Sequence, residues 1–247
     1  MPDIFQDSSR YFHISAFYAL SLPYYHMEHH THSSYEIMYI TSGSCRVFCL
    51  DGTQDTEFPL KSGQFIFIRP DVPHRLEIPD GFPCSILNLE FSLTPKKSPV
   101  ALELLLKKDP GFSQFWNFME ASQGFCSGAD SRSFGYSLKD LLTFLQQNSG
   151  QIQKEEFLFF LLFSRMLTEL AFCARSSRST QGIVYLKKAL CYIDEHYLED
   201  IDIPAISAYA GINKSYLQAL FTEKNGCTIN TLSLIHISEP TRLALIS

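Results

Sequence analysis

The chain has 247 residues, of which 45% are hydrophobic and 19% are charged, and its formal net charge is −6. This composition excludes wholesale disorder, and the length suits two domains or one large one. The acidic balance does not favour nucleic-acid binding, but it does not exclude it, because such binding depends on a local basic patch.

No targeting or membrane segment is expected from the sequence. The first residues lack the basic stretch and apolar run of a secretion signal. The most apolar segment, residues 157–172, is interrupted by Arg165 and Glu169, so we expect it not to cross a bilayer. The seven cysteines include no Cys-x-x-Cys pair and lie mostly in apolar surroundings. We therefore predict reduced, buried thiols in a cytoplasmic protein.

The first part of the chain, from about residue 11 to residue 95, is predicted to be β structure. Short apolar or alternating runs are separated by turn signals, of which Asp51-Gly52 is the strongest. These runs are residues 35–41, 45–50, 64–69 and 85–91. Regularly spaced short strands without a helical period indicate a sandwich or a barrel.

After Pro95 the pattern becomes helical. Helices are predicted at residues 102–108, 114–122, 138–147 and 155–175, with breaks at 110–111 and 124–135. The last of them is apolar over most of its circumference, so we expect it to be buried against the barrel or in a dimer seam. The polar segment 176–182 is predicted to be a linker.

The segment from residue 202 to residue 221 is predicted to form two short helices joined at a glycine, after an amphipathic helix at 183–197. Asp202 is a good N-cap, Pro204 fits a first helical turn, and Gly211 suits a helix end that needs a positive φ. This pattern indicates a helix-turn-helix, whose second helix is free to enter a DNA major groove. An ordinary helical hairpin is the alternative.

A histidine-rich segment precedes the first of the predicted strands, residues 35–41. If it is extended, His30, His32, Glu36 and Met38 share one face, because alternate residues of a strand point the same way. His74, after a Pro-Asp-Val-Pro turn, can supply a fourth ligand. Three nitrogens and one oxygen suit Fe, Mn, Ni, Zn or Cu, so we expect a possible divalent transition metal here. Effector binding or internal hydrogen bonding is the alternative.

Two motifs in this region resemble those of a known fold. The pattern His30-x-His32-x-x-x-Glu36, followed by Gly43, resembles the first cupin motif, and residues 63–74 resemble the second. The glycine usually found upstream of the first motif is absent. In the second motif, the spacing from Gly63 to Pro70 is one residue longer than usual, and the spacing from Pro70 to His74 is one residue shorter. All four metal-ligand positions are nonetheless filled.

A cupin followed by helices and this helix-turn-helix resembles the AraC/XylS family of transcription regulators, from about Tyr11 to Thr231. The resemblance implies an α+β multidomain fold. It comprises a cupin-like β-barrel (double-stranded β-helix) at 11–95, a helical dimerisation region at 96–175, and an all-α domain whose first helix-turn-helix is 183–231.

The implied function is sequence-specific transcription regulation by a cytoplasmic homodimer that binds operator DNA and a small-molecule effector and is not an enzyme. The alternative is a metal-dependent cupin enzyme, a dioxygenase or isomerase, with a helical appendage. In the regulator, Gln218 can read adenine, while Lys214 and Tyr216 suit phosphate contacts. The full set of implied DNA-contacting positions is Asn213, Lys214, Ser215, Tyr216, Gln218 and Ala219.

The C-terminal segment departs from the family pattern. The family continues with a second, basic helix-turn-helix, whereas residues 232–247 are interrupted by Pro240 and resemble translated sequencing-adapter DNA. From Ile183 onward there are five basic and seven acidic residues, a net charge of −2. We therefore hypothesise that the natural gene continues with the family pattern beyond this point. A genuine stop codon directly after Ser247 in the sequenced locus would contradict this.

Overall fold

The computed structural model describes residues 10–51, 54–121, 124–148, 154–196, 202–212 and 214–225. The chain divides into two compact units, residues 1–177 (unit 1) and residues 178–247 (unit 2). The strands of unit 1 are β1 (Tyr11–Leu22), β2 (Tyr25–His26), β3 (Tyr35–Ser42), β4 (Ser44–Asp51), β5 (Gln54–Lys61), β6 (Gln64–Ile68), β7 (His74–Ile78), β8 (Cys84–Thr94) and β9 (Phe125–Ala129). The helices are α1 (Leu102–Lys108), α2 (Pro110–Ala121), α3 (Phe134–Gln147), α4 (Glu156–His196), α5 (Ile203–Ala210) and α6 (Lys214–Asn225).

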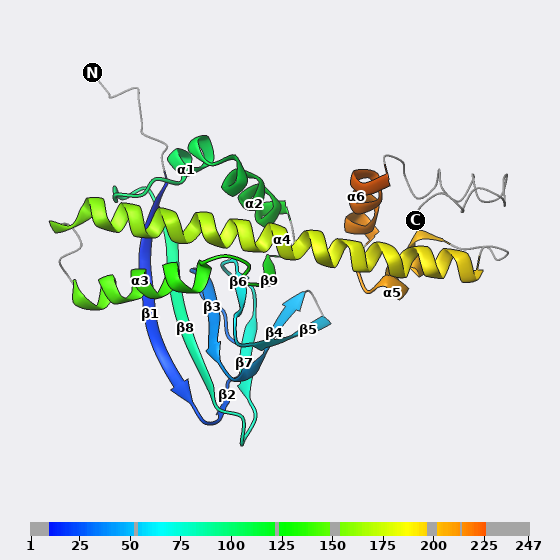
Figure 1. Cartoon of the computed structure of the whole chain (residues 1–247), viewed down its shortest axis with the longest axis horizontal. Helices are drawn as coiled ribbons and strands as arrows, with labels where there is room; N and C mark the ends of the chain where they lie inside the picture. Colours follow the sequence, from blue (N-terminus) through cyan, green and yellow to red (C-terminus); the bar gives the residue numbers. More distant parts are fainter. Residues whose placement is uncertain are drawn as a thin grey trace. The chain divides into compact units, whose positions relative to one another are not determined.

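Unit 1 is built on two antiparallel sheets. The five-stranded sheet has the order β1-β8-β3-β6-β9, and the four-stranded sheet has the order β2-β7-β4-β5. Sequence neighbours β3 and β4 lie in different sheets, so the chain crosses between the sheets repeatedly, as the predicted barrel requires. Figure 1 shows α1, α2, α3 and the first half of α4 gathered on one side of the five-stranded sheet.

The five-stranded sheet is buried on both faces, and alternate residues serve two different cores. Along β3, Ile37 belongs to the core shared with the helices, whereas Met38 and Ile40 belong to the core between the two sheets. In β8 the same alternation places Leu89 in the core shared with the helices and Ile86 in the core between the two sheets. Glu36 lies two residues before Met38 in β3, so its side chain points the same way, into the space between the two sheets.

The first half of α4 packs on the sheet through aromatic and aliphatic side chains. Phe163 is fully buried, and its ring centroid lies 5.3 Å from that of Phe12 and 5.6 Å from that of Phe91. Residues 156–177 are long and apolar enough to cross a membrane by length and composition alone, and 44% of their most apolar window is buried inside the protein. Packing against the sheet accounts for this apolar character.

Three segments differ from the prediction. Residues 125–129, expected to lie in a break between helices, form β9, which pairs with the edge of β6. The predicted helix at 114–122 begins earlier, at Pro110, since proline suits a first helical turn. The polar segment 176–182 is helical and lies within α4, which also includes the amphipathic helix expected from residue 183. The division between the units falls inside this segment, after Ser177.

Unit 2 confirms the predicted helix pair. The Asp202 side chain accepts a hydrogen bond of 2.8 Å from the Ala205 backbone N–H, and Gly211 ends α5 with a φ of 76°. A small core joins α5, α6 and the last part of α4. Its buried members are Leu186, Ala189, Ile193, Ile206, Ala210, Leu217, Leu220 and Phe221. The tail at 232–247 lies outside the described residues.

Candidate functional site

The structure brings the three predicted histidines together, but not in the way that we expected. The prediction that His30 and His32 belong to a strand is wrong, because β3 begins only at Tyr35. His30 is instead held by an isolated bridge to His74, in which each backbone N–H donates to the carbonyl oxygen of the other residue at 3.0 Å. Backbone pairing, rather than side-chain alternation, therefore positions the first histidine.

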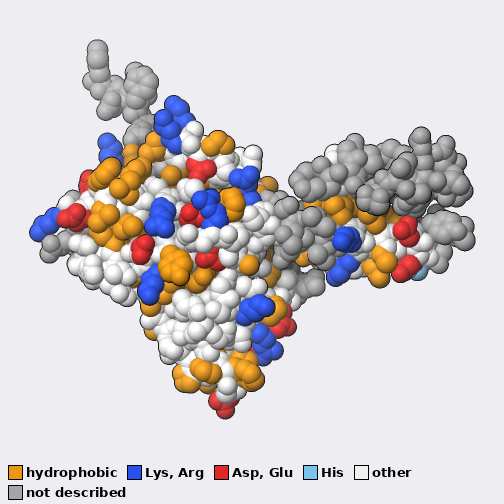
Figure 2. Space-filling view, viewed as in Figure 1, with side chains coloured by type: hydrophobic (Ala, Val, Ile, Leu, Met, Phe, Trp, Pro, Cys, Tyr) orange, Lys and Arg blue, Asp and Glu red, His pale blue; other side chains and the backbone are white. Residues whose placement is uncertain are grey.

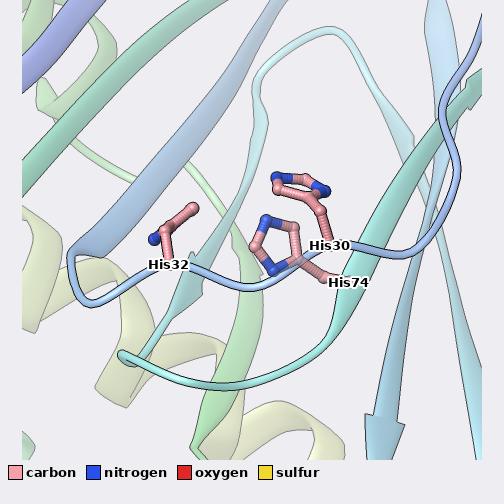
Figure 3. Close-up of side chains that lie close together, drawn as sticks. All are labelled: His30, His32 and His74. Carbon is pink, nitrogen blue, oxygen red and sulfur yellow. The ribbon is translucent and has the colours of Figure 1, made fainter.

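The imidazole rings are close-packed (Figure 3). The centroid of the His74 ring lies 4.3 Å from that of His30 and 5.0 Å from that of His32. One ring nitrogen from each of the three lies within 4.8 Å of the others, a separation from which they can hold one metal ion.

Glu36 is the acidic partner of the histidines. Its side chain is buried, and its Oε2 accepts a hydrogen bond of 3.1 Å from His32 Nε2 and lies 2.8 Å from His74 Nε2. Burial alone would raise the pKa of Glu36, but His32 and His74 overcome that effect and lower it to about 2. All four predicted ligands therefore meet at one place, with the carboxylate ionised.

The hydrogen bonds on the far side of two rings suit cation binding. The Nδ1 atoms of His32 and His74 lie 3.0 Å and 2.8 Å from the carbonyl oxygens of Ser34 and Val72. Because a carbonyl only accepts, each Nδ1 carries a proton, and each Nε2 is directed at the cluster, as in metal-binding histidines. Binding a cation would release the Nε2 proton that His32 shares with Glu36.

Two ring nitrogens lack partners, which supports the same interpretation. Among the described residues, His30 Nδ1 and His74 Nε2 are buried without a hydrogen bond of acceptable geometry. His74 Nε2 is one of these two atoms although Glu36 Oε2 lies 2.8 Å away, because the angle at which the two atoms meet is not that of a hydrogen bond. Burial, with the nearby His74, lowers the pKa of His30, so this ring is neutral and offers a lone pair. Buried unpaired nitrogens are costly unless a ligand satisfies them. The residues present therefore fit a divalent cation.

Two polar residues of β8, Asn88 and Glu90, also lie near this site and were not predicted from the sequence. Glu90 lies directly opposite Glu36 in the β3–β8 register, and Asn88 lies opposite Met38 on one side and Tyr18 on the other. Asn88 is fully buried, and neither atom of its amide has a hydrogen bond of acceptable geometry among the described residues. An amide and a carboxylate at alternate positions within the apolar run of β8 were the available signal.

Replacing Asn88 with leucine is expected to leave the free energy of unfolding of unit 1 unchanged or to raise it by up to about 1 kcal/mol, because an unsatisfied buried amide is replaced by an apolar group of similar size. Denaturant unfolding of the two proteins measures the difference. A loss of more than about 2 kcal/mol would show that the amide holds the fold together, for example through the neighbouring Tyr18 hydroxyl.

In unit 2, α6 presents a polar side to solvent. Lys214, Ser215 and Ala219 are exposed and Gln218 is partly so, whereas Leu217, on the opposite side of the helix, is fully buried. Of the other residues proposed to contact DNA, Asn213 lies outside the described residues, and nothing is described of the Tyr216 side chain. The four described positions are thus free to contact a ligand outside the unit.

Comparison with known proteins assigns the family. The model of the AraC-like ligand binding domain matches residues 13–162, which is more than half of the chain. The chain belongs to the AraC family. It is 24% identical over 224 residues to the HTH-type transcriptional regulator YbfI of Bacillus subtilis (strain 168), and the match covers 87% of this chain and 72% of YbfI.

Solved structures with detectable similarity include ToxT from Vibrio cholerae with an unsaturated fatty acid bound. It is 14% identical with a TM-score of 0.35, and the match covers 94% of this chain and 79% of ToxT. A cupin protein from Bacteroides fragilis is 23% identical with a TM-score of 0.26, and the match covers 30% of this chain and 62% of that protein. At these TM-scores neither match adds to the fold seen directly in this AraC-family chain.

Proposed function

We propose that the protein is a sequence-specific, DNA-binding transcription regulator that responds to a small-molecule effector bound in its barrel. The observation that carries this proposal is the α5–α6 pair, with its Asp202 cap, its left-handed Gly211 and the exposed polar side of α6. The AraC-like ligand-binding domain in unit 1 supplies the sensing part. We infer a cytoplasmic location from this role.

The exposed side of α6 suits a DNA major groove. Gln218 has an amide that can pair with adenine through two hydrogen bonds, and Lys214 has a charge that suits a phosphate. Ser215 and Ala219 are short, so they permit close approach of the helix but discriminate little between bases. Because unit 2 and its flanking sequence carry few basic residues, we expect few phosphate contacts for each protomer.

Two substitutions on this side of α6 should have different effects on DNA binding. Gln218→Ala should lower the preference for the operator over a site with one altered adenine by about 1–3 kcal/mol, with an unchanged salt dependence. Lys214→Ala should weaken binding to all sequences and reduce the slope of log affinity against log salt by about 1. Fluorescence anisotropy over a salt series measures both. Equal, sequence-independent effects of the two substitutions would contradict base reading by Gln218.

The effector site is proposed to lie between the two sheets, at the cluster of His30, His32, Glu36 and His74, with a divalent transition metal as part of it. Unpaired buried nitrogens in the cluster and the unpaired Asn88 amide beside it support this location, since the surrounding core is apolar. When bound, the cation would supply a Lewis-acidic centre. The protein side chains orient a ligand there and exclude water. A ligand changes DNA binding only if it favours one of two conformations of the regulator.

A homodimer is the proposed assembly, formed through the helices of unit 1. One side of α4 carries exposed apolar side chains, and Figure 2 shows hydrophobic side chains at the surface on the helical side of this unit. Phe157 is 73% exposed, and Leu158 and Leu161 are also exposed. Exposed apolar patches of this kind commonly mark protein interfaces.

A metal-dependent enzyme is the second candidate, because all four ligand positions of a cupin metal site are filled and meet in space. The regulator and the enzyme are distinguished by testing one purified sample for metal content, for turnover and for retention of the DNA that flanks its gene. Stoichiometric redox-active metal with turnover and no DNA retention would favour the enzyme.

A further inference from the structure

Glu90 is a half-buried carboxylate without a lysine or arginine counter-charge among the described residues. It lies directly across from Glu36 in neighbouring strands, where like charges destabilise a sheet. Burial, and then the charge of Glu36, raise the pKa of Glu90. Within the described part of the chain, neither lysine nor arginine forms an ion pair with it, and only histidines of the cluster lower its pKa. A cation placed between the two carboxylates would relieve their repulsion.

The position of Glu90 places it at the edge of the proposed cation site. One ligand atom each of His32, Glu36 and Glu90 lie within 4.8 Å of one another, and the same is true of His30, His32 and His74. The two groups share His32, and Glu36 Oε2 of the first group lies 2.8 Å from His74 Nε2 of the second. The two groups therefore adjoin, and between them they hold three ring nitrogens and two carboxylate oxygens from four segments of the chain.

The charge of the five groups matches that of a divalent cation. Two ionised carboxylates and three neutral imidazoles carry a charge of −2, so a divalent ion makes this partly buried site neutral. With Glu36 alone the loaded site would keep a net positive charge, which is less favourable than neutrality where side chains are partly removed from water. Five protein donors also exceed the four that zinc takes in most protein sites and approach the six preferred by larger divalent ions.

We propose that Glu90 is a fifth protein ligand of the cation site, and that the site is built for a six-coordinate divalent ion of the Mn²⁺ or Fe²⁺ kind in preference to four-coordinate Zn²⁺. The proposal rests on the cation site put forward under the proposed function. It assigns to Glu90 a role that the cupin-like motifs do not contain, and it leaves the sixth position to water or to an oxygen atom of the effector.

The test is calorimetric titration of the full chain with Mn²⁺ and, separately, with Zn²⁺, comparing the original protein with Glu90→Gln. The substitution is expected to raise the Kd for Mn²⁺ by about tenfold or more and the Kd for Zn²⁺ by less than about threefold, since zinc needs only four of the donors. Glu57→Gln, which removes a carboxylate from an exposed position of β5, is the matched control and should change neither value. The electron paramagnetic resonance spectrum of bound Mn²⁺ should also differ between the original protein and Glu90→Gln.

Unchanged Mn²⁺ affinity and an unchanged resonance spectrum in a folded Glu90→Gln protein would overturn the proposal while leaving a four-ligand site intact. Failure of the original protein to bind either ion would overturn the cation site as a whole, whereas the regulator function is judged separately by DNA binding. If circular dichroism shows that Glu90→Gln does not fold, Glu90→Asp provides the same comparison. Aspartate keeps the negative charge, but its side chain is one methylene shorter, so its oxygens lie farther from the cation. An Mn²⁺ affinity equal to that of the original protein would also overturn the proposal.

Discussion

Replacing Phe163 with alanine is expected to lower the free energy of unfolding of unit 1 by about 3–5 kcal/mol, the largest stability effect that we predict for a single side chain. The ring is fully buried where α4 meets the five-stranded sheet, and it packs against Phe12, Phe91 and Phe159. Alanine would leave a cavity that three aromatic rings, held in place by other contacts, cannot fill by collapsing.

Denaturant unfolding followed by near-ultraviolet circular dichroism measures this loss. Phe82→Ala is the matched control, because Phe82 is 62% exposed in the turn before β8, and we expect a change within about 0.5 kcal/mol. If the two substitutions cost the same, α4 does not pack on the sheet as the structure shows, and its apolar side must be buried elsewhere.

Replacing His74 with alanine is expected to weaken binding of Mn²⁺ and of Zn²⁺ by at least about 100-fold, because loss of even an outer-shell partner typically costs 10–100-fold and His74 is a direct ligand in this account. His74 is buried, touches both His30 and Glu36, and holds its ring through the Val72 carbonyl. Calorimetric titration provides the measurement.

His13→Ala is the control for this prediction, since the His13 ring bonds the Lys96 carbonyl and belongs to neither group of candidate ligands, and cation affinity should not change. An unchanged affinity in the His74→Ala protein would show that the cluster is not a cation site. The histidines would then serve an organic effector or the internal hydrogen bonding of the barrel.

Much of the fold follows from local patterns in the sequence. The four predicted runs all coincide with strands, because turn signals such as Asp51-Gly52 separate them clearly. Residues 125–129 carry no such pattern. These residues are extended because they pair with the edge of β6, a tertiary interaction that local propensity does not predict.

The candidate site was predictable in its members but not in its geometry. His30, His32, Glu36 and His74 were found from their spacing, yet the reason given for two of them, alternation along a strand, was wrong, because the backbone bridge to His74 positions His30. Glu90 becomes visible only once the β3–β8 register is known, since that register places it opposite Glu36. Register is set by pairing between distant segments, and a single sequence does not specify it.

In unit 2 the prediction from sequence was more complete. Asp202, Pro204 and Gly211 act through contacts within a few residues of themselves, so their roles as cap, first turn and helix end follow from local rules. The exposed positions of α6 likewise follow from helical periodicity once the buried Leu217 and Phe221 are placed.

The measurement that tests the account most directly is a salt-titrated mobility-shift assay of the full chain on the DNA that flanks its gene, with unrelated DNA as competitor. The account predicts a complex that survives the competitor and weakens steadily as salt rises, as expected when phosphate contacts hold the protein and α6 reads the bases. Equal retention of flanking and unrelated DNA at every salt concentration, from a sample whose helix content shows that α5 and α6 are folded, would contradict it.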